Sequence, residues 1–417
     1  MVESKWRRTA KNLAICLAAA AMLLAAVLLA ALAPMRAALA AGGPVNPPPG
    51  RAAVETPAAV EATHVPLSTL LALVPDNASS RAWLSYSDMI AWHEATGVPR
   101  VASYAAIEAL AEADRSAWLY TRSEQTAPPP VLGLNEIATG TMRPALGFDF
   151  FDVAQALESG QAPENVVWVN LHVAPEAIAT ALTATGYAQS DEAGAVLYSR
   201  GDDYATDFSA ETLAGQMGSL NRIALLDSDN AGSQVLIARA TAPITQSLAT
   251  ATGDSRSLAD DRTYRTLAGA LEYEGLIPGA LVGLVVQDGM QPMQTVLQDN
   301  QIDTALLDRY ARDPLPPYRL SAYATTRDGD DTYLTVLLAM DGTSDSSDAA
   351  AILGDRLSDY TSALTGEPLS DQWEVVTTGS YESEARLAYV VLKLIPESDL
   401  AWTELLARRD LLFLYAR

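Results

Sequence analysis

The stretch that decides the fold runs from residue 318 to residue 340 and reads YRLSAYATTRDGDDTYLTVLLAM. Its two arms, Tyr318 to Thr326 and Tyr333 to Met340, are rich in apolar, β-branched and aromatic residues, so we predict a strand for each. Asp328-Gly329 lies between the arms, and this dipeptide is a strong signal for a hairpin turn. The stretch therefore predicts a β-hairpin.

A helix is predicted directly after this hairpin, over residues 346–364. Four of its large apolar residues, Leu353, Leu357, Tyr360 and Leu364, follow a helical spacing and share one face. Further elements are predicted to follow: strands over 373–378 and 387–394, a helix over 400–407 and a last strand over 411–415. From Tyr333 onward the predicted order is β-α-β-β-α-β, the ferredoxin-like split βαβ arrangement.

The preceding part of the chain, residues 166–286, has a similar rhythm. Its first strand, 166–173, places Val167, Val169 and Leu171 on one face. The other predicted elements there are a helix over 175–185, a strand over 195–199, an inserted loop with a short helix over 201–219, a hairpin of 222–226 with 234–238, helices over 243–251 and 264–274, and a strand over 280–286. We therefore predict an α+β fold with two ferredoxin-like modules and antiparallel sheets, preceded by an apolar helix and a linker.

Upstream of these modules, a strand is predicted over residues 82–86, with Ser87 capping a helix to about Ala95. A helix over 104–113 and a strand over 117–121 are predicted next. The predicted division of the whole chain is a signal peptide or signal anchor (1–40), a Pro/Ala-rich linker (41–66), an α+β domain with insertions (67–315) and a ferredoxin-like domain (316–417).

The N-terminus has the order of an export signal. A basic stretch with Lys5, Arg7, Arg8 and Lys11 precedes Leu13 to Ala33, which spans 21 residues without charge or proline. Its length suits a membrane-spanning helix, whereas its ten alanines suit a cleavable signal.

Both interpretations place the body outside the cytoplasm, because the positive-inside rule keeps the basic end inside. The chain is then either a single-pass membrane protein, with the membrane as partner through residues 13–33, or secreted after cleavage near Ala40. The linker from Gly42 to Pro66 favours an extended, semi-rigid spacer.

The charge of the body excludes one class of partner. The chain has 27 basic and 51 acidic residues and a net charge of −24; residues after position 40 alone carry −28. Such a surface repels nucleic acid, so no nucleic-acid partner is expected. The only cysteine, Cys16, lies in the apolar stretch, so the exported body forms no disulfide.

Catalytic motifs are weak throughout. His64 is expected to be solvated in the linker, His93 to be a surface or packing residue, and His172 to lie on a half-buried polar strand face. Ser219 follows Gly218 without an assignable base, and Lys393 is expected to be structural. The sequence predicts no catalytic residue, no metal ligand and no cofactor.

Two further sets of residues have structural explanations. Acidic clusters at 227–233, 328–331 and 341–348 fit turns and helix caps better than a calcium site. The tryptophans Trp83, Trp118 and Trp168 are expected to pack in the core, although tryptophans at strand positions also suit a glycan groove.

Two short phrases resemble exported bacterial proteins of a domain-of-unknown-function family: Leu73-Val74-Pro75-Asp76, and Ser257-Leu258-Ala259-Asp260-Asp261. The resemblance implies an exported protein and brings no catalytic residues with it. In physical terms the second phrase predicts a helix N-cap followed by acids that suit the helix dipole.

The leading functional hypothesis is a non-enzymatic extracytoplasmic scaffold or binding protein. Two alternatives stay open: a cell-envelope hydrolase with an unrecognised site, and a binder of a soluble ligand in a cleft between modules. An enzyme is expected to gather titratable groups in one pocket, whereas a scaffold is expected to expose an apolar patch.

Overall fold

The computed structural model describes residues 60–416, except 117, 119–129, 133–139, 227–231, 274–275, 290–307, 309, 343, 363–365, 367, 396–404 and 407–409. All of these described residues belong to one compact unit, Thr56–Arg417. The predicted export segment, the Ala40 cleavage site and most of the predicted linker lie outside the described residues.

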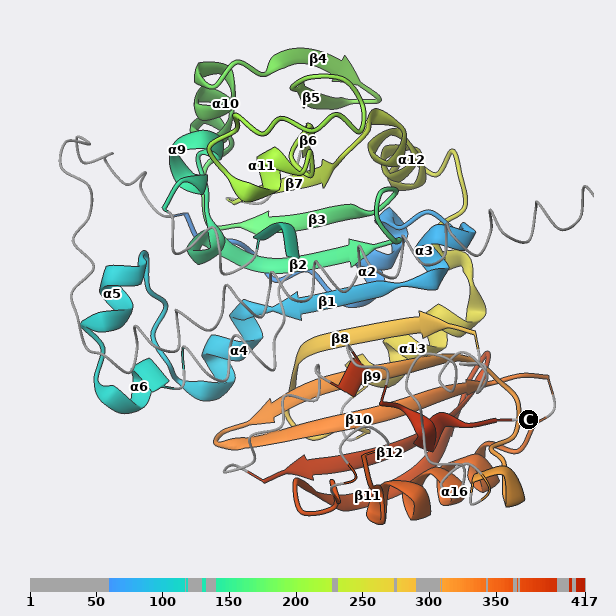
Figure 1. Cartoon of the computed structure of the whole chain (residues 1–417). Helices are drawn as coiled ribbons and strands as arrows, with labels where there is room; N and C mark the ends of the chain where they lie inside the picture. The colour runs from blue at the N-terminus through green and yellow to red at the C-terminus, as the bar shows by residue number, and fades with distance from the viewer. Residues whose placement is uncertain are drawn as a thin grey trace, which may run out of the picture. The chain divides into compact units, whose positions relative to one another are not determined.

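One antiparallel sheet organises this unit. Twelve strands in the described part of the chain pair in the order β11-β12-β10-β9-β8-β1-β2-β3-β7-β6-β5-β4 (Figure 1). The first seven are β1 (Leu84–Asp88), β2 (Val153–Ser159), β3 (Val166–Leu171), β4 (Ala188–Glu192), β5 (Ala195–Ser199), β6 (Arg222–Leu226) and β7 (Ser233–Ala238). The others are β8 (Ala280–Asp288), β9 (Tyr318–Asp328), β10 (Asp331–Met340), β11 (Trp373–Glu382) and β12 (Arg386–Leu394).

Helices connect and cover these strands, which confirms the α+β class. Those of the N-terminal part are α2 (Leu67–Leu70), α3 (Ala78–Ala82), α4 (Met89–Thr96), α5 (Tyr104–Glu108), α6 (Glu112–Ser116), α9 (Met142–Leu146), α10 (Pro175–Ala184), α11 (Leu213–Gln216) and α12 (Thr241–Ala251). The C-terminal part has α13 (Arg262–Glu272) and α16 (Ser346–Ser358). Single 3₁₀ turns are η1 (Leu71–Leu73), η3 (Pro130–Leu132), η4 (Phe150–Asp152), η5 (Leu258–Asp260) and η6 (Leu412–Leu414).

The two halves of the sheet follow one plan. In each half, three consecutive strands form a meander, a helix follows, and the strands after the helix lead back to the third strand. In the C-terminal half, α16 connects β10 to β11, and β12 lies between them antiparallel to both. This is the predicted split βαβ arrangement. In the N-terminal half, α10 connects β3 to β4, and three strands lie between them.

The last predicted strand is wrong. The segment 411–415 contains the 3₁₀ turn η6 (Leu412–Leu414) instead of a strand. In the ferredoxin-like order a fourth strand would pair with the free edge of β10, but β9 already occupies that edge. The segment is still buried as predicted, because Leu411, Leu412 and Phe413 are each at most 3% exposed.

Other predicted boundaries also shift. The helix predicted over 346–364 ends at Ser358, and Tyr360 turns inward to bond Asp410. Asp88, not Ser87, caps α4, since its carboxylate accepts from Ala91 N–H. The helix predicted over 104–113 is two short helices, α5 and α6. Most of the strand predicted over 117–121 lies outside the described residues.

The predicted domain boundary at 315/316 does not separate two units. Residues 67–315 and 316–417 both belong to the unit Thr56–Arg417. Strand β8 pairs with β9 across the boundary, from Ala280 opposite Arg327 to Asp288 opposite Leu320. One continuous sheet therefore joins the two predicted modules, because the edge strand of each finds its partner in the other.

Apolar residues alternate along the strands and bury both faces of the sheet. On β3, Val167, Val169 and Leu171 pack into one cluster, which confirms their predicted shared face, and Trp168 packs into another. Trp118 is also buried, at 2% exposure, and Trp83 packs against the C-terminal cluster around α16. The tryptophans therefore contribute to the core as predicted.

The two phrases that carry the family resemblance lie side by side where the halves meet. Pro75 and Ser257 form an isolated bridge, and Leu258 N–H donates to Val74 O over 2.8 Å. Ser257 and Asp260 form a capping box around η5, and Asp261 caps α13. The predicted N-cap is therefore confirmed.

Arg81 links the two phrases through ion pairs. Its guanidinium lies 2.6 Å from the carboxylate of Asp76 and 2.8 Å from that of Asp261, and Arg319 approaches Asp261 to 3.1 Å. These contacts link α3, which precedes β1, to α13, which precedes β8, so they fasten the junction of the two halves.

Candidate functional site

The residues singled out in the sequence do not meet at one site. Lys393 lies on β12 and His172 directly after β3, six positions apart in the sheet. At a strand spacing of about 4.8 Å that is a separation on the order of 29 Å. His93 lies on α4, where its ring packs edge-on against Trp92 at 4.9 Å and its Nδ1 lies 2.7 Å from Val98 O.

Lys393 has a structural partner. Its ammonium lies 2.7 Å from Asp331 on the neighbouring strand β10, and both side chains are more than a third exposed. The hydrogen bond from Lys393 accordingly lowers the pKa of Asp331. Such a pair holds a protonated lysine, so it does not prepare the amine to act as a base.

His64 is not simply solvated, contrary to prediction. Its Nε2 lies 2.9 Å from Asp88, whose side chain is 1% exposed. Asp88 also accepts from Tyr86 and Gln155, so a buried carboxylate receives three partners. The hydrogen bond to Asp88 raises the pKa of His64.

This contact belongs to a docked segment, residues 60–66, which forms the end of the predicted linker. Its backbone bonds to polar side chains of the sheet: Ala62 N–H donates to His172 Nδ1, Asn170 donates to Thr63 O, and Gln155 bonds both backbone groups of Val65. His172 is therefore a buried anchor, at 6% exposure, rather than a half-buried face residue.

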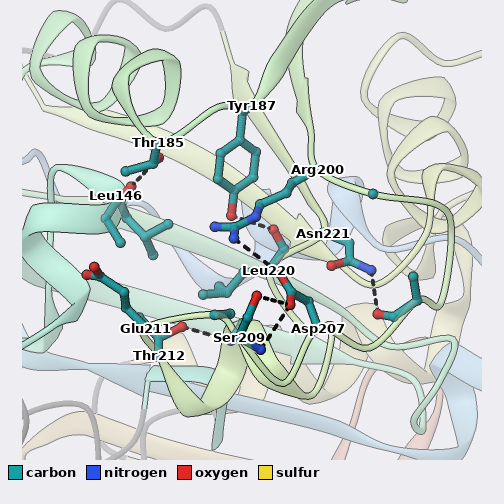
Figure 2. A pocket seen from close by; sticks show the side chains of 15 residues that line it. Leu146, Thr185, Tyr187, Arg200, Asp207, Ser209, Glu211, Thr212, Leu220 and Asn221 are labelled. Atoms are coloured by element: carbon teal, nitrogen blue, oxygen red, sulfur yellow. Dashed lines mark hydrogen bonds and ion pairs between the residues drawn. The ribbon is translucent and has the colours of Figure 1, made fainter.

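A polar recess lies elsewhere, under the insert, residues 201–219. Figure 2 shows this cavity of about 560 Å³. Its walls come from the end of α9, the residues after α10, the end of β5 and the insert itself. The lining residues are Ala145, Leu146, Thr185, Tyr187, Arg200, Gly201, Ala205, Asp207, Ser209, Ala210, Glu211, Thr212, Gly215, Leu220 and Asn221.

Two residues explain why the insert folds over the sheet. Gly218 has a φ of +75°, and a Cβ there would lie 2.1 Å from the carbonyl oxygen of Ala205, so only glycine fits. The amide of Asn221 donates to Asp202 O and Ala205 O, at 3.2 and 2.8 Å. These contacts fix the start of the insert against its end.

The inner wall is a set of polar groups that includes one cation, Arg200, and two carboxylates, Asp207 and Glu211. Arg200 donates to Asp207 over 3.2 Å, and Ser209 donates to the same carboxylate through its hydroxyl and its N–H (Figure 2). The bonds from Ser209 lower the pKa of Asp207. Burial raises the pKa of Tyr187 to about 12, and its hydroxyl donates to Leu220 O. Both shifts move the group away from neutral pH, which does not suit general acid–base catalysis.

Sequence reasoning predicted the insert as a loop with a short helix, and α11 is that helix, but it did not predict the cavity. Ser219, which it considered as a nucleophile, donates its N–H to Ala214 O and does not line the cavity. Asp227 to Ala231, part of the acidic cluster considered for calcium, lie outside the described residues. The sequence feature that could have indicated the cavity was the high content of Asp, Ser and Thr in residues 201–219, which lie between two confirmed strands.

Comparisons with known proteins find no family model and no curated protein that matches this chain. Three crystal structures of TP0453 are similar in part. Form III covers 78% of this chain and 94% of its own, with 11% identity and a TM-score of 0.34. Form I covers 86% and 99%, with 10% identity and a TM-score of 0.33. Form IV covers 76% and 91%, with 9% identity and a TM-score of 0.31. TM-scores of this size do not establish a common fold.

A search for membrane-spanning helices returned none from the part of the chain that the structure describes.

Proposed function

We propose that this chain is a non-enzymatic binding protein that is exported across a membrane and takes a small, neutral, polar ligand in the cavity under the insert. The observation that carries the proposal is the cavity's lining. Hydroxyl, amide, guanidinium and carboxylate groups face a recess of about 560 Å³ in which Arg200 and Asp207 already pair. A charged ligand would compete with that pair, whereas a neutral ligand with donors and acceptors would add to it.

The lining supports binding over catalysis. The two lining groups whose pKa shifts, Tyr187 and Asp207, stay in their ordinary ionisation states near neutral pH. Pockets that bind small molecules combine a preformed shape with a few fixed polar groups, and Gly218 and Asn221 fix the shape of this one.

The test is a thermal-shift and calorimetric screen of the full-length chain against neutral polyols, mono- and disaccharides and zwitterionic amino acids. A ligand at 100 times its Kd is expected to stabilise the body by about 2.7 kcal/mol. Arg200→Gln is expected to weaken binding about tenfold or more, because it removes a charged donor from the wall.

Lys393→Gln is the matched control. The Lys393–Asp331 pair has side chains 37% and 39% exposed, close to the 40% and 45% of Arg200 and Asp207, but it lies outside the cavity. Equal losses of binding in both variants would refute the cavity as the site. Turnover of any ligand, lost with Arg200→Gln, would favour the envelope hydrolase instead.

Export is tested separately from binding. The basic and apolar N-terminal stretch supports a body outside the cytoplasm, tethered through Leu13 to Ala33 or released near Ala40. A reporter enzyme that is active only outside the cytoplasm, fused after Pro66, is expected to be active. An inactive fusion, with a cytoplasmic reporter active at the same point, would overturn the topology.

A further inference from the structure

Four buried polar residues lie in a row beneath the docked segment, residues 60–66. Asp88 on β1 is opposite Gln155 on β2, and Gln155 is opposite Asn170 on β3, so these three side chains share one face of the sheet (Figure 1). Hydrogen bonds from Gln155 to Asp88 and from Asn170 to Gln155 join them, over 2.9 and 3.3 Å. With His172, which follows β3, they form what we call the polar row, and all four are at most 6% exposed.

The polar row binds the docked segment chiefly through the main chain of that segment. Four hydrogen bonds join side chains of the row to backbone groups: Ala62 N–H to His172 Nδ1 (3.1 Å), Asn170 to Thr63 O (2.8 Å), and Gln155 to the N–H and the O of Val65 (2.8 and 3.0 Å). Since every peptide carries the same backbone groups, this pattern of contacts also fits an extended segment of another protein.

Two positions of the docked segment restrict which side chains fit. Ala62 is buried, and a Cβ added to Gly232 would lie 3.1 Å from the Ala62 Cβ, so little space remains for a larger residue at position 62. Val65 packs against the apolar core cluster that contains Leu157 and Trp168. A matching segment therefore has a small residue at the first of these positions and an aliphatic residue at the second.

Charge determines a third position. The His64 side chain lies 2.9 Å from the buried carboxylate of Asp88, and the charges of Glu94 and Glu272 act on it as well. A lysine or arginine at this position keeps its charge at neutral pH, so it is complementary to these carboxylates. The site therefore favours a cation there.

A second copy of the chain is a poor source of the matching segment. Residues 60–66 extend over at most about 24 Å. Exchange of this segment between copies would therefore bring two bodies, each with a charge of −28, into contact. A segment of a different protein avoids this repulsion.

The docked segment fits the polar row incompletely. Asn170 Oδ1 is buried and accepts no hydrogen bond from the part of the chain that the structure describes. An unpaired buried acceptor is costly, so an occupant that donates to it would gain over the docked segment. The docked segment is also the first part of the chain that the structure describes, so no described helix or strand has to unfold when it leaves.

We propose that the polar row is a binding site for an extended segment of a partner protein, which displaces the docked segment. The partner's segment carries a small residue, a cation two positions later and an aliphatic residue directly after that, matching Ala62, His64 and Val65. This interaction goes beyond ligand binding in the cavity, which no residue of the polar row lines.

The test measures binding of a peptide to the full-length chain in zwitterionic nanodiscs. The probe is a dye-labelled peptide with the sequence of residues 60–68, followed by fluorescence anisotropy. In the wild-type chain the attached segment competes with the probe at high effective concentration. Ala62→Trp is expected to release that segment without altering the polar row, so it should bind the probe about tenfold or more tightly than wild type. Val60→Trp, at a half-buried position of the same segment, is the matched control and is expected to behave as wild type.

Changes in the probe test the recognition itself. An ester in place of the amide at Val65 removes the N–H that bonds Gln155 and is expected to weaken binding about tenfold. An ester at Thr63, whose N–H donates to none of the described residues, is expected to leave binding unchanged. Lys in place of His64 is expected to bind about threefold more tightly at pH 8, and Glu about tenfold more weakly.

Hydrogen exchange at Val65 N–H measures release of the docked segment. Release in Ala62→Trp without binding of the probe would overturn the proposal, and so would equal binding by the wild-type chain, which would place the probe elsewhere. A segment that stays docked in Ala62→Trp, and also after Val65→Asp is added, would be a permanent part of the fold and would equally overturn it. Dimers that form by exchange of the segment, without any probe, would assign the polar row to a second copy instead.

Discussion

The two halves of the sheet share a plan but differ in the path that the chain takes after the helix. In the C-terminal half the chain returns through one hairpin, β11-β12, and the helix α16 spans two sheet positions. In the N-terminal half the return takes four strands, and the insert interrupts it between β5 and β6. The insert that covers the cavity belongs to this longer return. All lining residues of the cavity come from the half with the longer return, and the half with the short return contributes none.

The halves also differ in how an irregular segment packs against each of them, which we call its closure. The C-terminal half is closed by η6, whose residues are buried against α16. The N-terminal half is crossed by the docked segment, which contacts the sheet through hydrogen bonds to polar side chains. The first closure combines apolar packing with hydrogen bonds from Arg356. The second depends on polar groups, among them His64, whose pKa is raised by its bond to Asp88.

Substitution of two glycines is expected to give the largest difference in stability between the halves. Gly279 and Gly218 have positive φ, and an added Cβ would lie 2.0 and 2.1 Å from a backbone carbonyl oxygen. Gly279→Ala disturbs the β8–β9 junction of the sheet, so we expect a loss of about 4 kcal/mol or no folded protein. Gly218→Ala disturbs only the insert, so we expect about 2 kcal/mol together with loss of ligand binding.

Urea denaturation of both variants, with ligand titration, measures this contrast. Gly253→Ala is the control, because its φ is +79° but nothing lies within 4 Å of the added Cβ. If Gly218→Ala destabilised the protein as much as Gly279→Ala does, the insert would be an integral part of the folded core.

Loss of the contacts that hold η6 in the C-terminal half is expected to give the next largest loss of stability. Arg356, 7% exposed, donates to the backbone carbonyls of Phe413, Tyr415, Tyr310 and Asp313. Arg356→Met leaves these buried acceptors without their donor, so we expect a loss of about 3 kcal/mol. Arg265→Met, which breaks an exposed pair with Glu384, is the control and is expected to change stability little. Similar midpoints of unfolding in the two variants would show that η6 is not anchored by Arg356.

The junction between the halves predicts a pH dependence. Burial acts to raise the pKa of Asp261, but bonds from Arg81 and Thr263 and the charge of Arg319 outweigh it and lower this pKa to about 2. A carboxyl with a depressed folded-state pKa stabilises the fold above its unfolded value of about 3.9, and that stabilisation is lost as pH falls toward 2.

Asp261→Asn should therefore destabilise the protein at pH 6 by about 1.5 kcal/mol, and the difference from wild type should shrink as pH falls from about 4 toward 2. Asp331→Asn, at an exposed pair with Lys393, is expected to change stability little. A constant difference at all pH values would mean that Asp261 acts through helix capping alone.

Much of the fold could be predicted from local pattern. The hairpin β9-β10, the strands β6 and β7 and the split βαβ around α16 rest on strong strand and turn signals, which local sequence carries. The terminal strand was wrong because apolar residues at 411–415 indicate burial but not what buries them; only the sheet order reveals that β9 takes the available edge. The single sheet across residues 315/316 escaped prediction for the same reason, since strand pairing is a long-range property.

The candidate site was less predictable than the fold. His64 was expected to be solvated because it lies in the predicted linker, whereas its partner Asp88 comes from β1. The cavity depends on Arg200, Asp207 and Asn221, which are ordinary polar residues in any loop. Nothing in their spacing distinguishes a wall of a recess from a solvated turn, because the recess exists only once the insert folds back over β5 and β6.

The smallest expected effect tests the polar closure of the N-terminal half. The bond to Asp88 raises the pKa of His64, with Glu272 and Glu94 adding to the effect and burial opposing it. A histidine with a raised folded-state pKa stabilises the fold below its unfolded value of about 6.5, and this contribution is lost as pH rises through the folded value. Because the His64 side chain is 50% exposed, we expect only about 0.5 kcal/mol.

His64→Gln should therefore unfold at a lower temperature than wild type at pH 5.5 and at the same temperature at pH 9, where both side chains are neutral. His93→Gln is the control, because the ring of His93 bonds the backbone oxygen of Val98. Hydrogen exchange at Ala62 and Val65, whose N–H groups bond His172 and Gln155, should accelerate in His64→Gln at low pH only. Unchanged exchange there would mean that His172 and Gln155 hold the docked segment without His64. The contact of this segment with the sheet would then not depend on the protonation of His64.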